Sequence, residues 1–125
     1  MHKKLLVMLI ILLIAKHVMF DAMTEDRGGK LLHAGLHGVS TQMILLVCAP
    51  VLSIPVILTL AAFDFGVHYA VDKVKLIAFR EKYKRNGTVT RVEYWTLTIL
   101  DQALHAMTYA IIMLVVIRSI RREVI

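Results

Sequence analysis

Residues 31–63 read LLHAGLHGVSTQMILLVCAPVLSIPVILTLAAF and contain no lysine, arginine, aspartate or glutamate. As one helix with a rise of 1.5 Å per residue this run would be roughly 50 Å long, whereas the hydrocarbon core of a bilayer is about 30 Å thick. Pro50 and Pro55 disfavour a continuous helix near the middle of the run. The run therefore predicts two membrane-spanning helices joined by a tight turn within APVLSIP, residues 49–55.

The composition of the whole chain also favours a membrane protein. Of its 125 residues 58% are hydrophobic and 19% are charged, and the mean hydropathy is +0.71. A soluble domain is about 45–50% apolar and about 25% charged, so a soluble domain of this composition would lack the polar residues to cover its surface. The net charge of +6 comes from basic residues beside apolar runs. We therefore expect membrane lipids with anionic headgroups as partners, and no nucleic acid.

Two further apolar runs complete an all-α bundle of four transmembrane helices. The first follows Lys3 and Lys4 like a signal peptide, but it lacks the paired small residues of a cleavage site, so we expect an uncleaved helix. The last begins beside Tyr94 and Trp95, which suit an interfacial aromatic belt. We predict one domain, residues 1–125, in an antiparallel up-down order, located in the bacterial inner membrane. The predicted spans are about 5–23, 30–49, 54–79 and 95–117, with a basic connection over 80–94 that turns at Asn86-Gly87.

Each predicted span carries a pair of ionisable residues four positions apart. The pairs are His17/Asp21, His33/His37, His68/Asp72 and Asp101/His105. At this spacing two side chains share one face of a helix, one turn apart, as two ligands of one metal ion do. The up-down order puts all four pairs at one depth, and the opposite half of the bundle has no histidine or charged residue. The sequence therefore predicts a polar cluster within one leaflet.

A divalent metal ion is the partner that best fits these side chains. A carboxylate at the centre of a membrane helix costs roughly 2.5–3.5 kcal/mol, so it needs a compensating partner. Mixed imidazole and carboxylate ligands suit Zn²⁺ first, with Mn²⁺ and Fe²⁺ as alternatives, and the number of ligands allows one or two ions. The candidate metal ligands are His17, Asp21, His33, His37, His68, Asp72, Asp101 and His105. The alternative is that the pairs hydrogen-bond to each other and join the helices without a metal.

Other residues receive supporting roles. Asp21, Asp72 and Asp101 are candidate catalytic bases, and Lys30 and Lys75 are candidates to hold an anionic substrate. Asp64 and Gln102 are expected to hydrogen-bond to the metal ligands. We expect Lys16 to extend to the membrane interface, and Gly35 and Gly38 to permit close helix approach. The hydroxyl groups of Ser40, Thr41, Thr98 and Thr108 are expected to form hydrogen bonds between helices.

Over roughly residues 16–105 the chain resembles a bacterial and phage family of multi-pass membrane proteins of unknown function. The motifs that carry the resemblance are H-x3-D, K-x2-H-x3-H, H-x3-D-x2-K and D-Q-x2-H. Here they are His17/Asp21, Lys30/His33/His37, His68/Asp72/Lys75 and Asp101/Gln102/His105. The segment AMTEDRGG, residues 22–29, departs from the longer aromatic- and glutamine-containing stretch of that family. The spacing is also similar to that of small inner-membrane metal-dependent hydrolases, an analogy that implies hydrolysis.

These observations favour a membrane-embedded, metal-dependent hydrolase that acts on a lipid or lipid-linked phosphoester at one membrane interface. A metal-ion or proton transporter or channel is the first alternative, because intramembrane carboxylates and histidines line ion pathways. Redox chemistry at haem or a di-iron site, and a non-enzymatic membrane interaction protein, also remain open.

Overall fold

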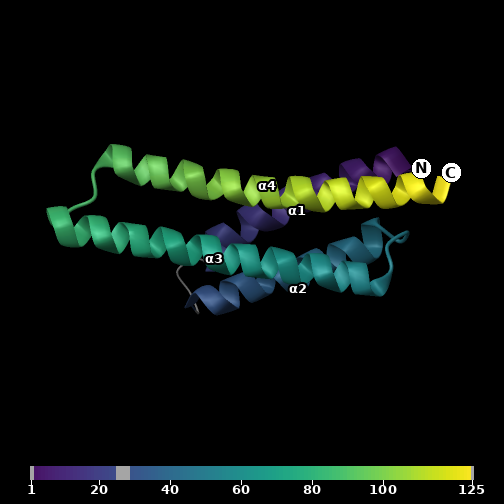
Figure 1. Cartoon of the computed structure of the whole chain (residues 1–125), viewed down its shortest axis with the longest axis horizontal. Coiled ribbons are helices and arrows are strands. Elements are labelled where there is room, and N and C mark those ends of the chain that lie inside the picture. The colour runs from purple at the N-terminus through teal and green to yellow at the C-terminus, as the bar shows by residue number, and fades with distance from the viewer. Residues whose placement is uncertain (1, 25–28, 125) are drawn as a thin grey trace.

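The structure, a computed structural model, describes residues 2–24 and 29–124, and these residues fold into four α-helices. The helices are α1 (His2–Thr24), α2 (Gly29–Cys48), α3 (Ile54–Asn86) and α4 (Arg91–Val124). Successive helices run in opposite directions, and α1 begins at the end of the molecule where α4 finishes (Figure 1). The prediction of an all-α chain of four helices is confirmed. Each of the four is long and apolar enough to cross a membrane.

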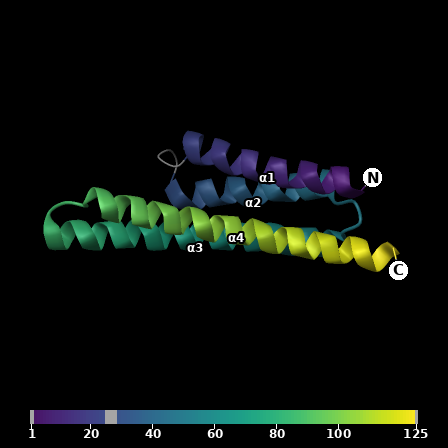
Figure 2. The ribbon, with the colours of Figure 1, turned by 90° about the horizontal axis from the view of Figure 1, so that it is seen from above.

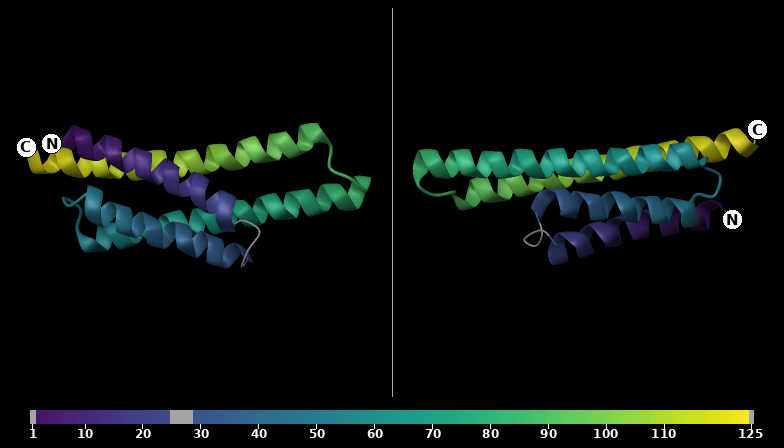
Figure 3. Two further views of the ribbon diagram at one scale, coloured as in Figure 1. Left: turned by 180° about the vertical axis from the view of Figure 1, so that it is seen from behind. Right: turned by 90° about the horizontal axis from the view of Figure 1, so that it is seen from below.

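The four helices form two pairs of unequal length. Helices α1 and α2 have 23 and 20 residues, whereas α3 and α4 have 33 and 34. The α3–α4 pair continues past the ends of α1 and α2 as a two-helix hairpin (Figure 2). Among the helix pairs in contact, packing is closest between α2 and α3 and loosest between α1 and α4, which lean apart towards the C-terminal end of α1 (Figure 3).

The predicted break between the second and third helices is confirmed. α2 ends at Cys48 and α3 begins at Ile54, with Pro55 in its first turn. Proline suits this position because the first amides of a helix have no intrahelical acceptor.

Gly38 brings α2 close to α3, as predicted. A Cβ atom on Gly38 would lie 2.9 Å from Cβ of Phe65 and 3.2 Å from the carbonyl oxygen of Ala61. The prediction that Gly35 also permits close helix approach is wrong, because a Cβ atom on Gly35 would meet nothing within 4 Å. Of the two glycines, only Gly38 is required by the packing of the bundle.

The basic segment 80–94 is mostly helical, which corrects the prediction of a long connection; the connection covers only residues 87–90. Gly87 ends α3 with a φ of 70°, and its N–H donates to the carbonyl oxygen of Tyr83. The turn predicted at Asn86-Gly87 is therefore confirmed.

A capping box at the start of α4 explains why the connection is so short. The Glu93 N–H donates to Thr90 Oγ1 over 3.2 Å, and the Thr90 N–H donates to Glu93 Oε2 over 3.0 Å. Lys82 joins the two helices through a 2.9 Å contact with Glu93. The basic residues of segment 80–94 therefore lie on the surfaces of α3 and α4. The prediction took their polarity as a sign of a connection between helices.

The bundle has an apolar exterior and a partly polar interior. At the end near the chain termini, the core is aliphatic and includes Leu9, Leu13, Leu45, Ile57, Leu60, Ile112 and Val116. Farther along, the interior holds lysine, histidine and aspartate side chains, while large aliphatic side chains such as Val7, Val39 and Ile99 are exposed. Soluble proteins show the opposite distribution, so this exterior fits a hydrocarbon environment.

Candidate metal centre

All eight candidate ligands come together in three groups, two of which share His37, and we call the whole set the His/Asp cluster. The groups are His17/His37/His68, Asp21/His33/His37 and Asp72/Asp101/His105. Within each group, one nitrogen or oxygen atom of every member lies within 4.8 Å of the others. Asp21 is partly buried and the other seven residues are buried. The spacing and the up-down order therefore predicted this convergence correctly, and each group has the composition to hold a metal ion.

The separations between donor atoms match those of ligands around an ion. Asp21 Oδ1 lies 3.3 Å from His33 Nε2 and 3.5 Å from His37 Nε2. His105 Nε2 lies 3.4 Å from both Asp72 Oδ1 and Asp101 Oδ1. Hydrogen bonds from N–H to oxygen measure about 2.7–3.2 Å. Two ligands of a tetrahedral zinc ion, each about 2.0–2.1 Å from the metal, lie about 3.3 Å apart.

Several atoms of the cluster lack a hydrogen-bond partner within the described part of the chain. They are His37 Nε2, Asp72 Oδ2, Asp101 Oδ1 and His105 Nδ1, and all four are buried. Leaving a buried polar group unsatisfied costs about 1–3 kcal/mol, and more if the group is charged. Each of the first three atoms lies within 3.5 Å of another potential metal ligand of the cluster. A cation between the donors would satisfy them.

Gln102 orients His17, as expected from the sequence. Its Nε2 donates to Asp101 Oδ2 over 3.1 Å and lies 3.4 Å from Asp21 Oδ2. Its Oε1 therefore faces His17 Nε2, at 3.0 Å. Because an amide oxygen only accepts, His17 Nε2 carries a proton, and in the neutral ring Nδ1 keeps its electron pair. The Tyr109 hydroxyl lies 3.2 Å from that Nδ1.

Asp64 orients His68 in the same way. The Nδ1–H of His68 donates to Asp64 Oδ1 over 2.9 Å, which leaves the electron pair of the neutral ring on Nε2. That Nε2 lies 3.3 Å from His17 Nδ1, so two electron pairs face each other and require a shared proton or a cation. Carboxylates fix metal-binding histidines through such a hydrogen bond in many proteins.

Lys16 is buried at 5% exposure, which corrects the prediction that its side chain extends to the interface. Its Nζ lies 2.6 Å from Asp64 Oδ2, donates to the His37 carbonyl oxygen over 3.0 Å and lies 3.4 Å from His37 Nδ1. The Thr41 hydroxyl donates to the same Asp64 oxygen. The prediction failed because Asp64, the partner that stabilises the ammonium inside the bundle, lies 48 residues away in the chain.

Thr41 and Tyr109 also contact residues of the centre, and the sequence predicted neither of these contacts specifically. Thr41 was expected to form a hydrogen bond between helices, and it does so with Asp64; Tyr109 received no role. Thr41 follows His37 by four residues, and Tyr109 follows His105 by four. Extending the same spacing by one helical turn would have found both.

Of the two predicted substrate lysines, Lys75 contacts the cluster directly. Lys75 Nζ donates to Asp101 Oδ2 over 3.0 Å, and its side chain is 18% exposed. Lys30 is partly buried in the first turn of α2. Lys75 is thus an ion-pair partner of a candidate metal ligand as well as a candidate substrate contact.

The charges of the cluster are unbalanced within the described residues. Asp64 pairs with Lys16 and Asp101 pairs with Lys75. Asp21 and Asp72 contact histidines, and Asp21 also contacts Gln102, but neither forms an ion pair with a lysine or an arginine among residues 2–24 and 29–124. A buried carboxylate and a partly buried one without a cation are costly, so protonated imidazoles or metal ions would balance them. The donor separations are compatible with metal ions.

No family model, curated protein or solved structure matches this chain. The resemblance to the bacterial and phage membrane family therefore stays a prediction.

Proposed function

We propose that this chain is an integral membrane protein whose His/Asp cluster binds a divalent metal and hydrolyses a lipid or lipid-linked phosphoester at one membrane interface. The observation that carries the proposal is the set of buried donors from four helices, separated like the ligands of an ion. Zn²⁺ is the favoured ion for histidine and aspartate donors, and Mn²⁺ and Fe²⁺ are the alternatives.

The depth of the cluster supports a lipid substrate. Trp95 is half-exposed and precedes Asp101 by six residues, roughly 9 Å along α4. If Trp95 marks the membrane interface, as exposed tryptophans of membrane helices do, the cluster lies just below the headgroups. The phosphoester of a membrane lipid lies at that depth.

The proposed reaction needs a nucleophile, a base and an anion-binding group. An oxygen of water bonds to phosphorus, the bond from phosphorus to the ester oxygen breaks, one proton passes to a base, and a proton reaches the leaving oxygen. A divalent ion lowers the pKa of its bound water and polarises the phosphoryl oxygen. Asp21 is the candidate base because it is the one carboxylate of the cluster that is only partly buried. Lys30 and Lys75 are the candidates to hold the phosphate.

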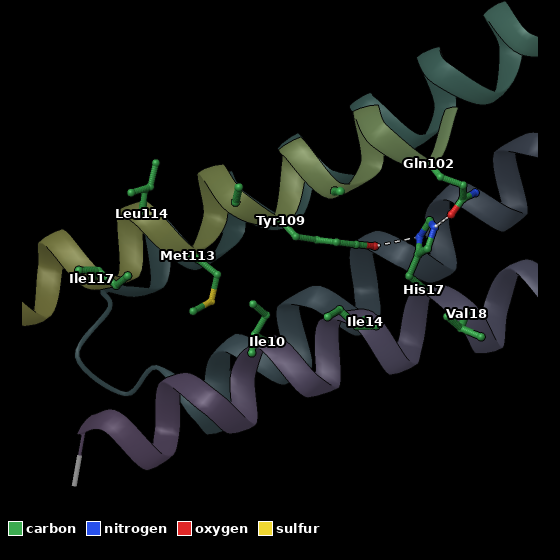
Figure 4. A pocket seen from close by; sticks show the side chains of 11 residues that line it. Ile10, Ile14, His17, Val18, Gln102, Tyr109, Met113, Leu114 and Ile117 are labelled. Atoms are coloured by element: carbon green, nitrogen blue, oxygen red, sulfur yellow. Dashed lines mark hydrogen bonds between the residues drawn. The ribbon is translucent and has the colours of Figure 1, made fainter. Parts of the chain in front are cut away.

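A groove between α1 and α4 supports a substrate with a hydrocarbon chain (Figure 4). Its volume is about 700 Å³, and aliphatic side chains such as Ile10, Ile14 and Leu114 line most of it. His17 and Gln102 lie at one end, where the groove meets the cluster. A mainly apolar pocket with a few polar groups at one end suits an amphipathic ligand.

Transport of ions is less well supported. On the side of the chain termini, the described residues below the cluster pack into an aliphatic core that includes Leu13, Leu45, Ile57 and Ile112. An ion path would need polar groups across both halves of the bundle. The packed core supports a site open to one side.

Elemental analysis tests the metal binding that the proposal requires. We expect detergent-purified protein to contain near-stoichiometric Zn, Mn or Fe, and the His33→Ala/His37→Ala variant to lose it. His2→Ala is the matched control, because His2 lies outside the groups of donors. Absence of metal from the wild-type protein, even after reconstitution, would contradict the proposal.

Hydrolysis is tested with lipid phosphoesters in mixed micelles. We expect phosphate-containing product that disappears with chelator and returns with the metal. Lys75→Ala should lose turnover and keep its metal if Lys75 holds the headgroup; unchanged turnover would exclude that role.

The groove is tested by filling it. Ala106 lines the groove, whereas its neighbour Met107 is exposed and does not. We expect Ala106→Trp to slow hydrolysis of a long-chain substrate while sparing a short-chain soluble analogue, and Met107→Trp to change neither. Equal effects of both variants would contradict a role for the groove.

A further inference from the structure

We infer that the cluster holds two divalent ions and that the Asp72 carboxylate bridges them. The inference rests on the metal binding proposed above and specifies its stoichiometry. His37 belongs to two of the three donor groups, so the groups contain two independent sets of three donors. The first set is Asp21/His33/His37 and the second is Asp72/Asp101/His105. Each set combines imidazole and carboxylate donors, whereas the remaining group contains histidines only.

The two oxygens of Asp72 face different sets. Oδ1 lies 3.4 Å from His105 Nε2, a donor of its own set. Oδ2 lies 3.5 Å from His33 Nε2, a donor of the other set. Both separations are close to the distance of about 3.3 Å between two ligands of one ion. One carboxylate therefore has an oxygen available for each of two ions.

Asp72 Oδ2 has no other partner to explain its position. It is buried without a hydrogen bond in the described structure, and Asp72 as a whole is 6% exposed. Lys75 follows Asp72 by three residues, but its ammonium group forms an ion pair with Asp101. An ion between Oδ2 and His33 would satisfy this oxygen, and a second ion would lie between Oδ1, Asp101 and His105.

His68 keeps the two sets adjacent. Its ring stacks on His37 with a centroid separation of 3.8 Å and on His105 with a separation of 4.0 Å, each at an interplanar angle of 20°. His37 belongs to the first set and His105 to the second. The His68 ring therefore lies between a donor of the first set and a donor of the second, and the carboxylate of Asp72 reaches donors of both sets.

Two ions would also make the site suitable for an anionic substrate. Asp21, Asp72 and Asp101 carry three negative charges when ionised, so two divalent ions leave an excess of one positive charge. Lys75, bound to Asp101, adds another. A single ion together with Lys75 would only balance the three carboxylates and would leave no positive charge to attract a phosphate. The bridged pair thus explains how a site rich in aspartate could bind a phosphoester.

Metal titration and electron paramagnetic resonance of the Mn²⁺-loaded full-length protein in detergent test the inference. We expect two equivalents of Mn²⁺ and the spectrum of an exchange-coupled pair. Asp72→Asn should remove the coupling and weaken the second ion at least about tenfold. Glu81→Gln is the matched carboxylate-to-amide control that should keep both ions coupled, because Glu81 is exposed and lies outside the groups of donors.

The outcomes separate this inference from the proposed function. One equivalent of Mn²⁺ with the spectrum of isolated ions would overturn the bridged pair and leave a mononuclear centre. Two equivalents without coupling would overturn the bridge. No bound metal would overturn both proposals. If Asp72→Asn fails to fold, the coupling and stoichiometry of the wild-type protein still decide.

Discussion

Lys16 and Asp64 form an ion pair inside the bundle, and their side chains are 4% and 0% exposed. We expect Lys16→Met to lower the free energy of unfolding by about 3–5 kcal/mol, because it leaves Asp64 as a buried charge. The double variant Lys16→Met/Asp64→Asn should recover a large part of that loss, since it removes both charges and keeps groups that can bond to Thr41 and His68. Unfolding titrations in detergent measure both variants. Equal destabilisation by the single and double variants would contradict the ion pair.

Asp64 has a second role that a metal titration can isolate. Its hydrogen bond to His68 Nδ1 aims the opposite ring nitrogen into the cluster. We expect Asp64→Ala to weaken metal binding about 10–100-fold, as loss of such orienting partners does elsewhere. Competition with a chelator gives the affinity. Ser119→Ala is the control, because the Ser119 hydroxyl donates to Val115 within its own helix; a similar loss in that variant would point to general destabilisation.

At the scale of single residues, the sequence predicted which side chains converge but not all of their partners. A shared spacing of four residues on four apolar helices was enough to place the eight donors together. Lys16 was misjudged because a lone lysine beside an apolar run normally reaches the interface. Its burial depends on Asp64, and no local pattern links two residues on different helices.

At the scale of helices, Gly38 and Gly35 form a matched pair for testing the α2–α3 contact. We expect Gly38→Ala to destabilise the protein by about 1–3 kcal/mol, because the new Cβ would lie 2.9 Å from Phe65 Cβ. Gly35→Ala should be neutral or stabilising by up to about 1 kcal/mol, because alanine favours helix and its Cβ meets nothing within 4 Å. Thermal unfolding in detergent compares them. Equal effects would show that α2 and α3 do not approach closely at Gly38.

The helix boundaries that are set by proline or glycine could be predicted from the sequence. The boundary that is set by side-chain capping, the start of α4, was not predicted. The prolines at positions 50 and 55 located the α2–α3 turn, and Gly87 located the α3–α4 turn. The long connection was wrong because the threonine and glutamate of the capping box start α4 near residue 91, within a segment too polar to suggest a span. The ends of a membrane span and the ends of a helix must therefore be predicted separately. The length of the apolar run determines the span, whereas backbone capping determines where the helix begins and ends.

At the scale of the whole molecule, the proposed metal centre would also be a cross-link. Its donors come from all four helices, and the α1–α4 contact is the loosest in the bundle. A bound ion shared between helices holds them together, since metal binding to the folded state adds directly to its stability. The half of the bundle near the chain termini has its aliphatic core, whereas the half with the cluster depends on polar contacts and on the proposed ions.

Metal removal and acid should therefore destabilise the protein through the same side chains. At a free metal concentration one hundred times the dissociation constant, one bound ion stabilises the folded state by about 2.7 kcal/mol, and chelator should remove that contribution. Protons compete with metal for the histidines, so this stabilisation should be present at neutral pH and be lost as the pH falls. Thermal unfolding across a pH series, with metal and with chelator, measures the difference. The two curves should converge in acid, and His33→Ala/His37→Ala should show little separation at any pH. Identical curves for the wild-type protein throughout would mean that hydrogen bonds alone join the four helices at the cluster.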